Sequence, residues 1–405
     1  MKKTITTPLF AASALLLAMS IASCSDEETS NAPGTTDDLS TEMAEVLDQY
    51  VNGTVVPTYR RLADAAISLD EECKTLYDNI SSGRATQQDV KDVCDAWLAA
   101  RKYWEYSEAF LLGPATINGI DPHIDSWPLD KQALDKMLDN TTIMDDMNDD
   151  YITSNYGSGG LCGFHALEYA VFADGHDKAV EEISADLAKY AYAVAGDLKL
   201  QCIVLEAAWA GTANVSQDKQ DLLEEKEATP DSGVDNYGLN FINAGQAGSR
   251  YRTQLEAIVD AIKADKGCYG IANEVGDTKI TDPVASQNVL DVESWYSFNS
   301  KTDFQDNIRG INNVIMGGIL YDDDNTRDES KSIYTLLRSR NQALADELKA
   351  AIDECIGEDG TTGLGTIIYP FRNNLEPEKN QVAIESCQRL RDKLMEVATW
   401  MQENM

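Results

Sequence analysis

Residues 161–172 read Leu-Cys-Gly-Phe-His-Ala-Leu-Glu-Tyr-Ala-Val-Phe, a largely apolar run that contains one histidine and one glutamate. In a helix, His165 and Glu168 would share one face with their Cβ atoms roughly 5–6 Å apart, because they are three positions apart. Large apolar side chains cover nearly every side of that helix, which is typical of a buried helix. A buried carboxylate is costly unless it is paired, hydrogen-bonded or bound to a metal. The stretch therefore predicts a buried helix that carries a polar site.

Helical spacing of apolar residues continues from position 39 to the C-terminus, with few alternating runs of the kind that form strands. The spacing predicts helices near 39–70, 71–81, 86–112, 130–139, 161–173, 178–210, 237–265, 303–320, 330–356 and 378–403. Long gaps remain at 113–129, 211–236, 266–302 and 357–377. Because the chain exceeds the length at which one core usually stops growing, we expect an all-α protein of two helical bundles, 39–215 and 216–405.

The N-terminal residues have the form of a bacterial lipoprotein export signal. Two lysines precede an apolar run at 9–21, and Ile-Ala-Ser-Cys at 21–24 resembles the motif that is cut before a lipidated cysteine. We expect a signal peptide at 1–23 that is removed, a lipid on Cys24 and a disordered tether at 24–38. The alternatives are an ordinary signal peptide that is cut nearby or a retained anchor helix.

Acidic residues follow Cys24 directly, and the whole chain carries a formal charge of −36. Ser-Asp-Glu-Glu at 25–28 resembles the signal that sends some lipoproteins to the outer face of the outer membrane; the other interpretation is a solvated linker. We expect an outer-membrane lipoprotein of the cell envelope. Its acidic surface would attract cations and repel nucleic acid, which we exclude as a partner.

The cysteines do not form a recognised metal or redox motif. The sequence has eight, of which Cys24 is the expected lipidation site, and none is spaced Cys-x-x-Cys. Some of the other seven could pair in an oxidising compartment, but an odd number leaves at least one thiol that is free or pairs outside the chain. Cys94, Cys162 and Cys202 lie in helical apolar patterns, where we expect inert core thiols.

A second polar site is predicted on the helix near 86–112. Continuing its apolar stripe with a period of 3.6 places Arg101 and Glu108 on the core-facing side, seven residues apart. Together with His165 and Glu168 they suggest one polar cluster inside an apolar bundle, as in helix-bundle metal sites. The alternative is a buried ion pair, or a helix end that is exposed to water.

The loop at 120–130 also carries acidic groups next to a tryptophan. Its two prolines favour extended conformations at Asp121 and Trp127, so we expect a rigid loop there. Asp125 from this loop or Glu108 would complete a shell around His165. One imidazole and two or more carboxylates suit Fe, Mn or Zn better than a thiol-seeking metal. A satisfied core histidine is the alternative for His165.

Several common sites are excluded. The three histidines, His123, His165 and His176, do not form the His-Glu-x-x-His motif of helical zinc peptidases. Gly-Thr-Thr-Gly-Leu-Gly at 360–365 fits neither a phosphate loop nor a dinucleotide fingerprint. The acidic runs at 145–150 and 322–324 lack the glycine and final glutamate of a calcium loop. His176 follows a helix end and is expected to be exposed.

Three blocks resemble the imelysin-like family. Gly-Phe-His-Ala-Leu-Glu at 163–168 fits the family's Gly-x-His-x-x-Glu signature. Residues 104–114 and 124–130 look like its upstream block, and residues 294–308 are similar to its second-half block. The resemblance spans about 39–405, and it rests on the order of the three blocks.

The resemblance implies two related helical bundles with a site near their junction. The residues that the resemblance implies are His165 and Glu168 from the signature, with Glu108, Asp125 and Asp130 from the upstream block. We expect His165, Glu168, Glu108 and Asp125 to be the metal ligands, and Arg101, Trp127 and Asp130 to line the site. The family was named for an insulin-cleaving peptidase activity, while many members are envelope proteins linked to iron uptake.

Three functions remain open at this point. The first is a cell-envelope lipoprotein that binds or takes up a metal, iron in the first place, or a metal-containing ligand. The second is a metallopeptidase in which Glu168 or Glu108 is the base. The third is a protein that binds a peptide or glycan and uses the His/Glu pair only for structure.

Overall fold

The computed structural model describes residues 36–156, 160–230, 235–320 and 325–405. These residues form helices and one two-stranded antiparallel sheet, so the predicted all-α fold is confirmed. The predicted signal peptide and Cys24 lie outside the described residues, and α1 already begins at Thr36, inside the predicted tether. Within the described residues, no helix has the length and apolar character needed to cross a membrane.

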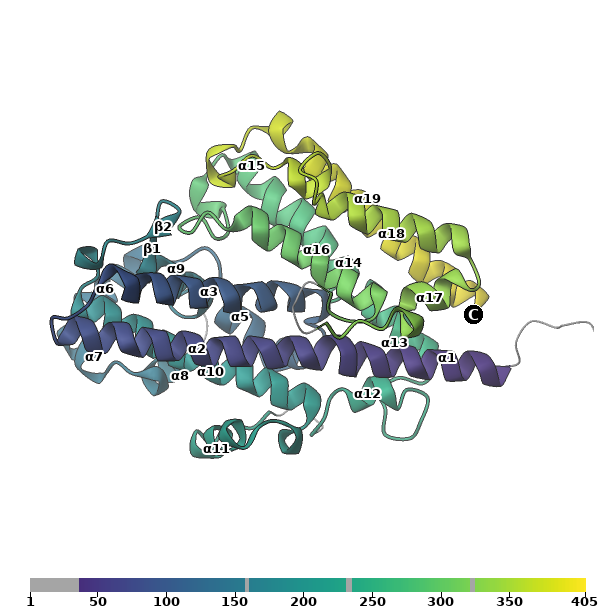
Figure 1. Cartoon of the computed structure of the whole chain (residues 1–405), viewed down its shortest axis with the longest axis horizontal. Coiled ribbons are helices and arrows are strands. Elements are labelled where there is room, and N and C mark those ends of the chain that lie inside the picture. The colour runs from purple at the N-terminus through teal and green to yellow at the C-terminus, as the bar shows by residue number, and fades with distance from the viewer. Residues whose placement is uncertain (1–35, 157–159, 231–234, 321–324) are drawn as a thin grey trace, which may run out of the picture.

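A single helical rod opens the fold and runs along the length of the molecule (Figure 1). It consists of α1 (Thr36–Gln49), the π-helical segment η1 (Tyr50–Val55) and α2 (Val56–Ser81). The predicted break at 70–71 is wrong. Cys73 and Leu76 are buried and continue the apolar face of α2, and neither glycine nor proline interrupts it there.

The first half is built around α2, α3 (Gln87–Ser107) and α10 (Ala185–Ala210), which pack side by side. The short helix α9 (Gly163–Val171) packs against α3 and α10, and the indoles of Trp97, Trp104 and Trp209 lie in this core. The smaller elements are η2 (Glu108–Phe110), α4 (Pro114–Ile117), α5 (Ile120–Ile124), α6 (Lys131–Leu138), α7 (Thr141–Asp146), α8 (Asp149–Tyr156), β1 (Phe172–Ala173), β2 (His176–Asp177), η3 (Val180–Glu182), η4 (Thr212–Asn214) and α11 (Gln217–Glu225).

The second half is built around α16 (Ser300–Met316), α18 (Gln342–Ile356) and α19 (Pro377–Asn404). Its smaller elements are α12 (Leu239–Ile242), α13 (Gln254–Lys263), α14 (Cys268–Asn273), the π-helical η5 (Glu274–Thr281), α15 (Asp282–Ser286), η6 (Val289–Asp291), η7 (Glu329–Lys331), α17 (Ile333–Arg338), η8 (Gly363–Thr366) and η9 (Phe371–Asn373). The predicted helix at 237–265 is therefore two helices. Gly245 and Gly248 between them adopt positive φ angles, which end the helical pattern.

The two halves meet where α16 packs on α3. A Cβ at Gly310 of α16 would lie 2.3 Å from the carbonyl oxygen of Tyr106, so the two backbones approach too closely for any larger residue. Helix α1 belongs to the first half in sequence but packs against α12, α13 and α17 of the second. The boundary at 215–216 stays a prediction.

Local details correct other predictions. Asp121 is helical rather than extended, because Pro122 lies in the first turn of α5, where a missing N–H leaves no helical hydrogen bond unmade. His176 is exposed in β2, as expected.

All seven cysteines from Cys73 to Cys387 are buried free thiols, including the predicted core thiols. The closest described pair is Cys355 and Cys387, with sulfurs 3.6 Å apart.

Candidate metal centre

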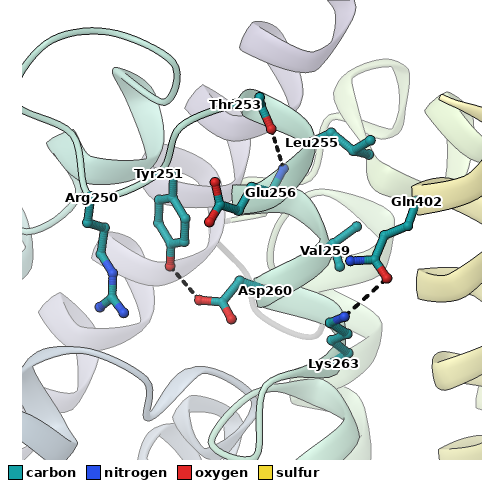
Figure 2. A pocket seen from close by; sticks show the side chains of 9 residues that line it. All are labelled: Arg250, Tyr251, Thr253, Leu255, Glu256, Val259, Asp260, Lys263 and Gln402. Atoms are coloured by element: carbon teal, nitrogen blue, oxygen red, sulfur yellow. Dashed lines mark hydrogen bonds between the residues drawn. The ribbon is translucent and has the colours of Figure 1, made fainter.

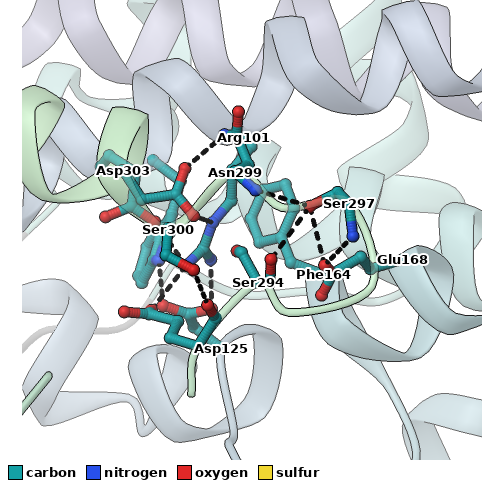
Figure 3. Close-up of polar contacts among 12 residues, drawn as sticks. Arg101, Asp125, Phe164, Glu168, Ser294, Ser297, Asn299, Ser300 and Asp303 are labelled. Atoms are coloured by element: carbon teal, nitrogen blue, oxygen red, sulfur yellow. Dashed lines mark hydrogen bonds and ion pairs between the residues drawn. The ribbon is translucent and has the colours of Figure 1, made fainter. Parts of the chain in front are cut away.

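The site predicted around His165 lies where the two halves meet, and Figure 3 shows four of its side chains, Arg101, Asp125, Glu168 and Asp303. We call it the His165 centre and define it by nine ionisable side chains, all at most 8% exposed: Arg101, Glu105, Glu108, Asp125, His165, Glu168, Lys279, Glu293 and Asp303. The first half supplies six of them from α3, η2, α9 and the residue after α5; the second half supplies three from η5, α16 and the loop between η6 and α16. The centre therefore joins the two halves of the chain.

Arg101 is the main cation of the centre and is fully buried on α3. Its guanidinium donates to Asp125 Oδ1 and, at 2.6 Å, to Glu293 Oε1. It is also ion-paired with Glu105 and, at 3.5 Å, with Asp303. Arg101 thus faces the core, as predicted. Its partners come from both halves.

Lys279 is the second permanent cation and reaches Glu108 from η5. Its Nζ lies 2.7 Å from Glu108 Oε2 and 3.1 Å from Glu293 Oε2. The side chain of Asn307 donates to Glu105 at 2.5 Å and to Glu108 at 2.6 Å. Glu108 therefore lies in the centre as predicted from its stripe, but it faces Lys279 and Asn307.

The imidazole of His165 is held from both edges. Its Nδ1 donates to Glu168 Oε2 at 3.1 Å, and its Nε2 lies 3.2 Å from Asp125 Oδ1 and 3.9 Å from Glu293 Oε1. The ring of Trp127 contacts it edge-on, with 4.7 Å between ring centroids. Within the described residues, Nε2 makes no hydrogen bond of good geometry, so this nitrogen points at acceptors without being fully engaged.

Glu168 links the histidine to the second half. Its other oxygen, Oε1, accepts hydrogen bonds from the backbone N–H of Tyr296 at 3.0 Å, and from Ser297 N at 2.8 Å and Ser297 Oγ at 2.7 Å. Ser294 and Phe298 flank this turn with φ angles of +50° and +62°. Such conformations cost free energy and persist only where surrounding contacts impose them. Glu168 thus holds the loop and orients the imidazole.

The first residue of the Gly-x-His-x-x-Glu signature must be glycine for steric reasons. Gly163 has φ +78°, and a Cβ there would lie 2.1 Å from the carbonyl oxygen of Ile124. Only glycine permits both the conformation and this approach. The contact brings the start of α9 against the end of α5, and so places His165 beside Asp125.

Three donor atoms of the centre lie close enough to share one ion. Asp125, His165 and Glu293 each offer one within 4.8 Å of the others. Glu293 was missed from the sequence, although it lies directly before the family-like block at 294–308. The predicted ligands Glu108 and Glu168 are not in this group. Asp130 is exposed and caps α6 by accepting from the N–H of Ala133, away from the group.

The centre carries more acidic than basic groups. Burial raises the pKa of Glu108 to about 8, although Lys279 opposes the shift. Burial likewise raises the pKa of Asp303 to about 7 against the effect of Arg101. The pKa of Asp125 instead falls well below its usual range, because Arg101 and then His165 outweigh its burial. The excess of buried negative charge is therefore reduced, because some of the carboxyl groups keep their protons.

His165 is positively charged at neutral pH in the metal-free protein. Burial alone would lower its pKa, but the carboxylates of Asp125 and Glu168 at the two edges of the ring raise it to about 9. An imidazole whose Nδ1–H is held by a carboxylate is the usual arrangement of a metal-bound histidine, with Nε2 as the ligand. The nitrogen and two carboxylates fit iron, manganese or zinc. Arg101 contacts the same oxygens, Asp125 Oδ1 and Glu293 Oε1, and balances them in the metal-free protein.

A separate surface pocket of about 520 Å³ lies along α13 and next to Gln402 of α19 (Figure 2). Its polar groups are largely paired with one another, with Tyr251 donating to Asp260 at 2.6 Å and Lys263 to Gln402 at 3.1 Å. The His165 centre is therefore the better candidate for a functional site.

Comparison with known proteins agrees with the blocks noted in the sequence. The imelysin family model matches residues 55–397. Iron-regulated protein A of Synechococcus elongatus is 25% identical over 348 residues, which are 85% of this chain and 81% of that protein. A crystal structure assigned to an iron-regulated protein A precursor from Parabacteroides distasonis has a TM-score of 0.74 at 29% identity, covering 91% of this chain and 96% of that one.

A more distant crystal structure shows the same fold. An imelysin-like protein from Psychrobacter arcticum has a TM-score of 0.55 at 15% identity, covering 89% of this chain and 93% of that one. Since the family model covers most of the described residues, the family assignment does not depend on any single relative. This chain belongs to the imelysin family.

Proposed function

We propose that this protein binds one metal ion, iron in the first place, through Asp125, His165 and Glu293. The observation that carries the proposal is the convergence of these three donors within 4.8 Å of one another, beside an imidazole oriented by Glu168. Nitrogen and carboxylate ligands suit Fe, Mn or Zn. The names of the relatives, which refer to iron regulation, support iron as the first metal to test.

Charge gives a second argument for a cation. Six carboxylates lie against two permanent cations and one histidine within a buried volume. Burying unpaired negative charge is costly, and a bound metal ion would replace the protons that now compensate it. Metal binding would also require Arg101 to release part of its hold on Asp125 and Glu293. Arg101 would then neutralise the centre whenever the metal is absent.

The geometry favours ion binding over peptide cleavage. His165 is only 1% exposed and the side chain of Glu293 8%, so a polypeptide could not reach the donors without a rearrangement of the surrounding loops. Glu168, the proposed base of a peptidase, already accepts four hydrogen bonds. A group so occupied is a poor proton acceptor for an attacking water.

The proposed place of action is the outer membrane of the cell envelope, with the chain anchored by a lipid on Cys24. The leader at 1–23 and the cysteine that follows it support this placement. Labelling with radioactive palmitate would test the lipid anchor. Cys24→Ser should abolish incorporation of the label while leaving the amount of protein similar.

Metal analysis of the protein from residue 25 onward tests the proposed function directly. After equilibration with ferrous, ferric, zinc or calcium ions, we expect saturable binding of a single ion at this centre. His165→Ala and Glu293→Gln should each abolish it, whereas His176→Ala is the matched control, because His176 is exposed in β2. Unchanged binding in both centre variants would refute the proposal. No binding by the folded protein would make the centre structural and turn attention to peptides, glycans and chelated iron.

A further inference from the structure

A second group of metal-type side chains lies outside the His165 centre. His123, Cys162 and Asp197 each offer one donor atom within 4.8 Å of the others, and all three are buried. His123 belongs to α5, Cys162 precedes the first residue of α9, and Asp197 lies in the middle of α10. We call this group the Cys162 cluster. It combines nitrogen, sulfur and oxygen donors in the core of the first half.

Hydrogen bonds hold the imidazole and the carboxylate of the Cys162 cluster against each other, and the thiol against nearby backbone carbonyl oxygens. His123 Nε2 lies 2.6 Å from Asp197 Oδ2, and Asp197 Oδ1 accepts from Thr153 Oγ1 at 2.6 Å. Cys162 Sγ lies 3.0 Å from the carbonyl oxygen of His123 and 2.9 Å from that of Tyr156, and its single S–H donates to this pair of acceptors. Thr153 thus holds the carboxylate of Asp197 in place. Metal-binding side chains are usually oriented by such a second hydrogen-bonding partner.

The same three residue types also form the triads of thiol hydrolases, but this reading fails here. Cys162 is 1% exposed, so no substrate reaches its sulfur. Burial also raises the pKa of this thiol to about 12, so that a reactive thiolate is not formed near neutral pH. A metal ion is small enough to enter where a substrate is not, and it displaces the thiol proton on binding.

We propose that Cys162, His123 and Asp197 form a second metal site, which takes zinc or a similar borderline-soft divalent ion. Thiolate, imidazole and carboxylate are the ligand types that zinc accepts together, and three protein ligands leave one position to a small ligand such as water. On binding, the metal–sulfur bond forms and the thiol proton goes to solvent. The ligand chemistry differs from that of the His165 centre, which contains no sulfur.

The position of the Cys162 cluster gives the metal a further effect. His123 is two residues before Asp125, and Cys162 is three residues before His165. A metal held by His123 and Cys162 would fasten the end of α5 to the start of α9, the same two segments that meet at Gly163 and Ile124. Occupation of the second site would therefore fix the spacing of two proposed ligands of the first.

Cobalt(II) distinguishes the two sites, because only a thiolate ligand produces a sulfur-to-cobalt charge-transfer band in the ultraviolet. We expect this band in the wild-type protein titrated with cobalt, and its loss when zinc is added. Cys162→Ser should abolish the band, and His165→Ala should retain it. Cys94→Ser is the matched control, since Cys94 is another buried thiol, whose sulfur donates only to the carbonyl oxygen of Val171 among the described contacts.

The outcomes separate this proposal from the proposed function. A band that survives in His165→Ala and disappears in Cys162→Ser supports the second site, whatever happens at the first. Absence of the band in the wild type, or its persistence in Cys162→Ser, overturns it. If Cys162→Ser does not fold by circular dichroism, His123→Gln replaces it. This variant must weaken cobalt binding at least tenfold while Cys94→Ser does not, and failure to do so also overturns the proposal.

Discussion

The His165 centre and the Cys162 cluster share two segments, the end of α5 and the start of α9, but they stabilise their buried polar groups differently. The His165 centre gathers many charges and balances them with Arg101 and Lys279, drawn from different halves. The Cys162 cluster lies within the first half, where one carboxylate is satisfied by one imidazole and one hydroxyl. The His165 centre therefore depends on ion pairs between the two halves, whereas the Cys162 cluster depends on a few hydrogen bonds within the first half. Their variants should differ accordingly.

The largest effect should come from removing the central cation. Arg101→Met leaves Asp125, Glu293 and Asp303 without their main partner in the core, and should lower the free energy of unfolding by about 3–5 kcal/mol. Urea denaturation followed by circular dichroism measures this. Arg338→Met is the control, because its exposed ion pair with Asp346 is worth about 0–1 kcal/mol. A cost below about 1 kcal/mol for Arg101→Met would contradict the dominant role of the ion pairs.

The second largest effect should be the pH dependence of stability, which arises in the His165 centre. The pKa of His165 is raised to about 9, so its contribution to stability is complete below the unfolded value of about 6.5 and is lost as pH rises through 9. The metal-free protein should lose about 3 kcal/mol from this group between those limits. The raised pKa of Glu108 acts in the same direction from lower pH. Urea midpoints at pH 6 and 9.5 measure the loss, and His165→Gln should flatten it. An equally steep fall in that variant would assign the effect to other groups.

Glu168→Gln tests whether the imidazole must be held by a carboxylate. The amide oxygen can still accept from the N–H groups of Tyr296 and Ser297, but its NH₂ group then faces the Nδ1–H of His165. We expect metal affinity to fall about 10- to 100-fold, as for other residues that orient a ligand. Isothermal titration calorimetry gives the affinity, with Glu182→Gln, an exposed glutamate, as the control. Wild-type affinity in Glu168→Gln would show that orientation is provided elsewhere.

The smallest effect is expected in the Cys162 cluster. Thr153→Val removes the hydroxyl that donates to Asp197 and leaves that carboxylate oxygen short of one bond, at a cost of about 1 kcal/mol. Thermal unfolding of the metal-free variant measures this, with the exposed Thr75→Val as the control. Metal binding at the His165 centre should be unchanged. A cost as large as that of Arg101→Met would remove the distinction between the two regions.

Much of the fold and half of the centre follow from local sequence patterns. The helix that carries His165 was predictable because its apolar residues surround two polar ones, and both proved buried. Arg101 and Glu108 were predictable because the stripe of their helix continues through them. The steric reason for Gly163 could not be read from the sequence, since it depends on contact with Ile124.

The remaining part of the centre comes from segments without a regular pattern. Glu293 lies in a loop, and Lys279 lies in a π-helical segment whose spacing does not match the 3.6-residue period. Neither residue lies on the apolar face of a regular helix, so the neighbouring sequence does not indicate that it is buried. Charge alone did not help, because acidic residues are common throughout this chain. The backbone partners of Glu168 at 296–297 could not be predicted for a related reason, since they are distant in sequence.

These distances along the chain determine when the centre can be completed. Arg101 and Glu293 are 192 positions apart, and Glu168 and Ser297 are 129 apart. Contacts of such sequence separation close long loops and form late in folding. A chain that crosses a membrane from its N-terminus delivers His165 well before Glu293, so an emerging chain has the histidine but not the full donor set. Under the proposed export and metal binding, the donor set would be completed only after the chain has crossed the membrane, so the metal ions present there would be the ones that the centre meets first.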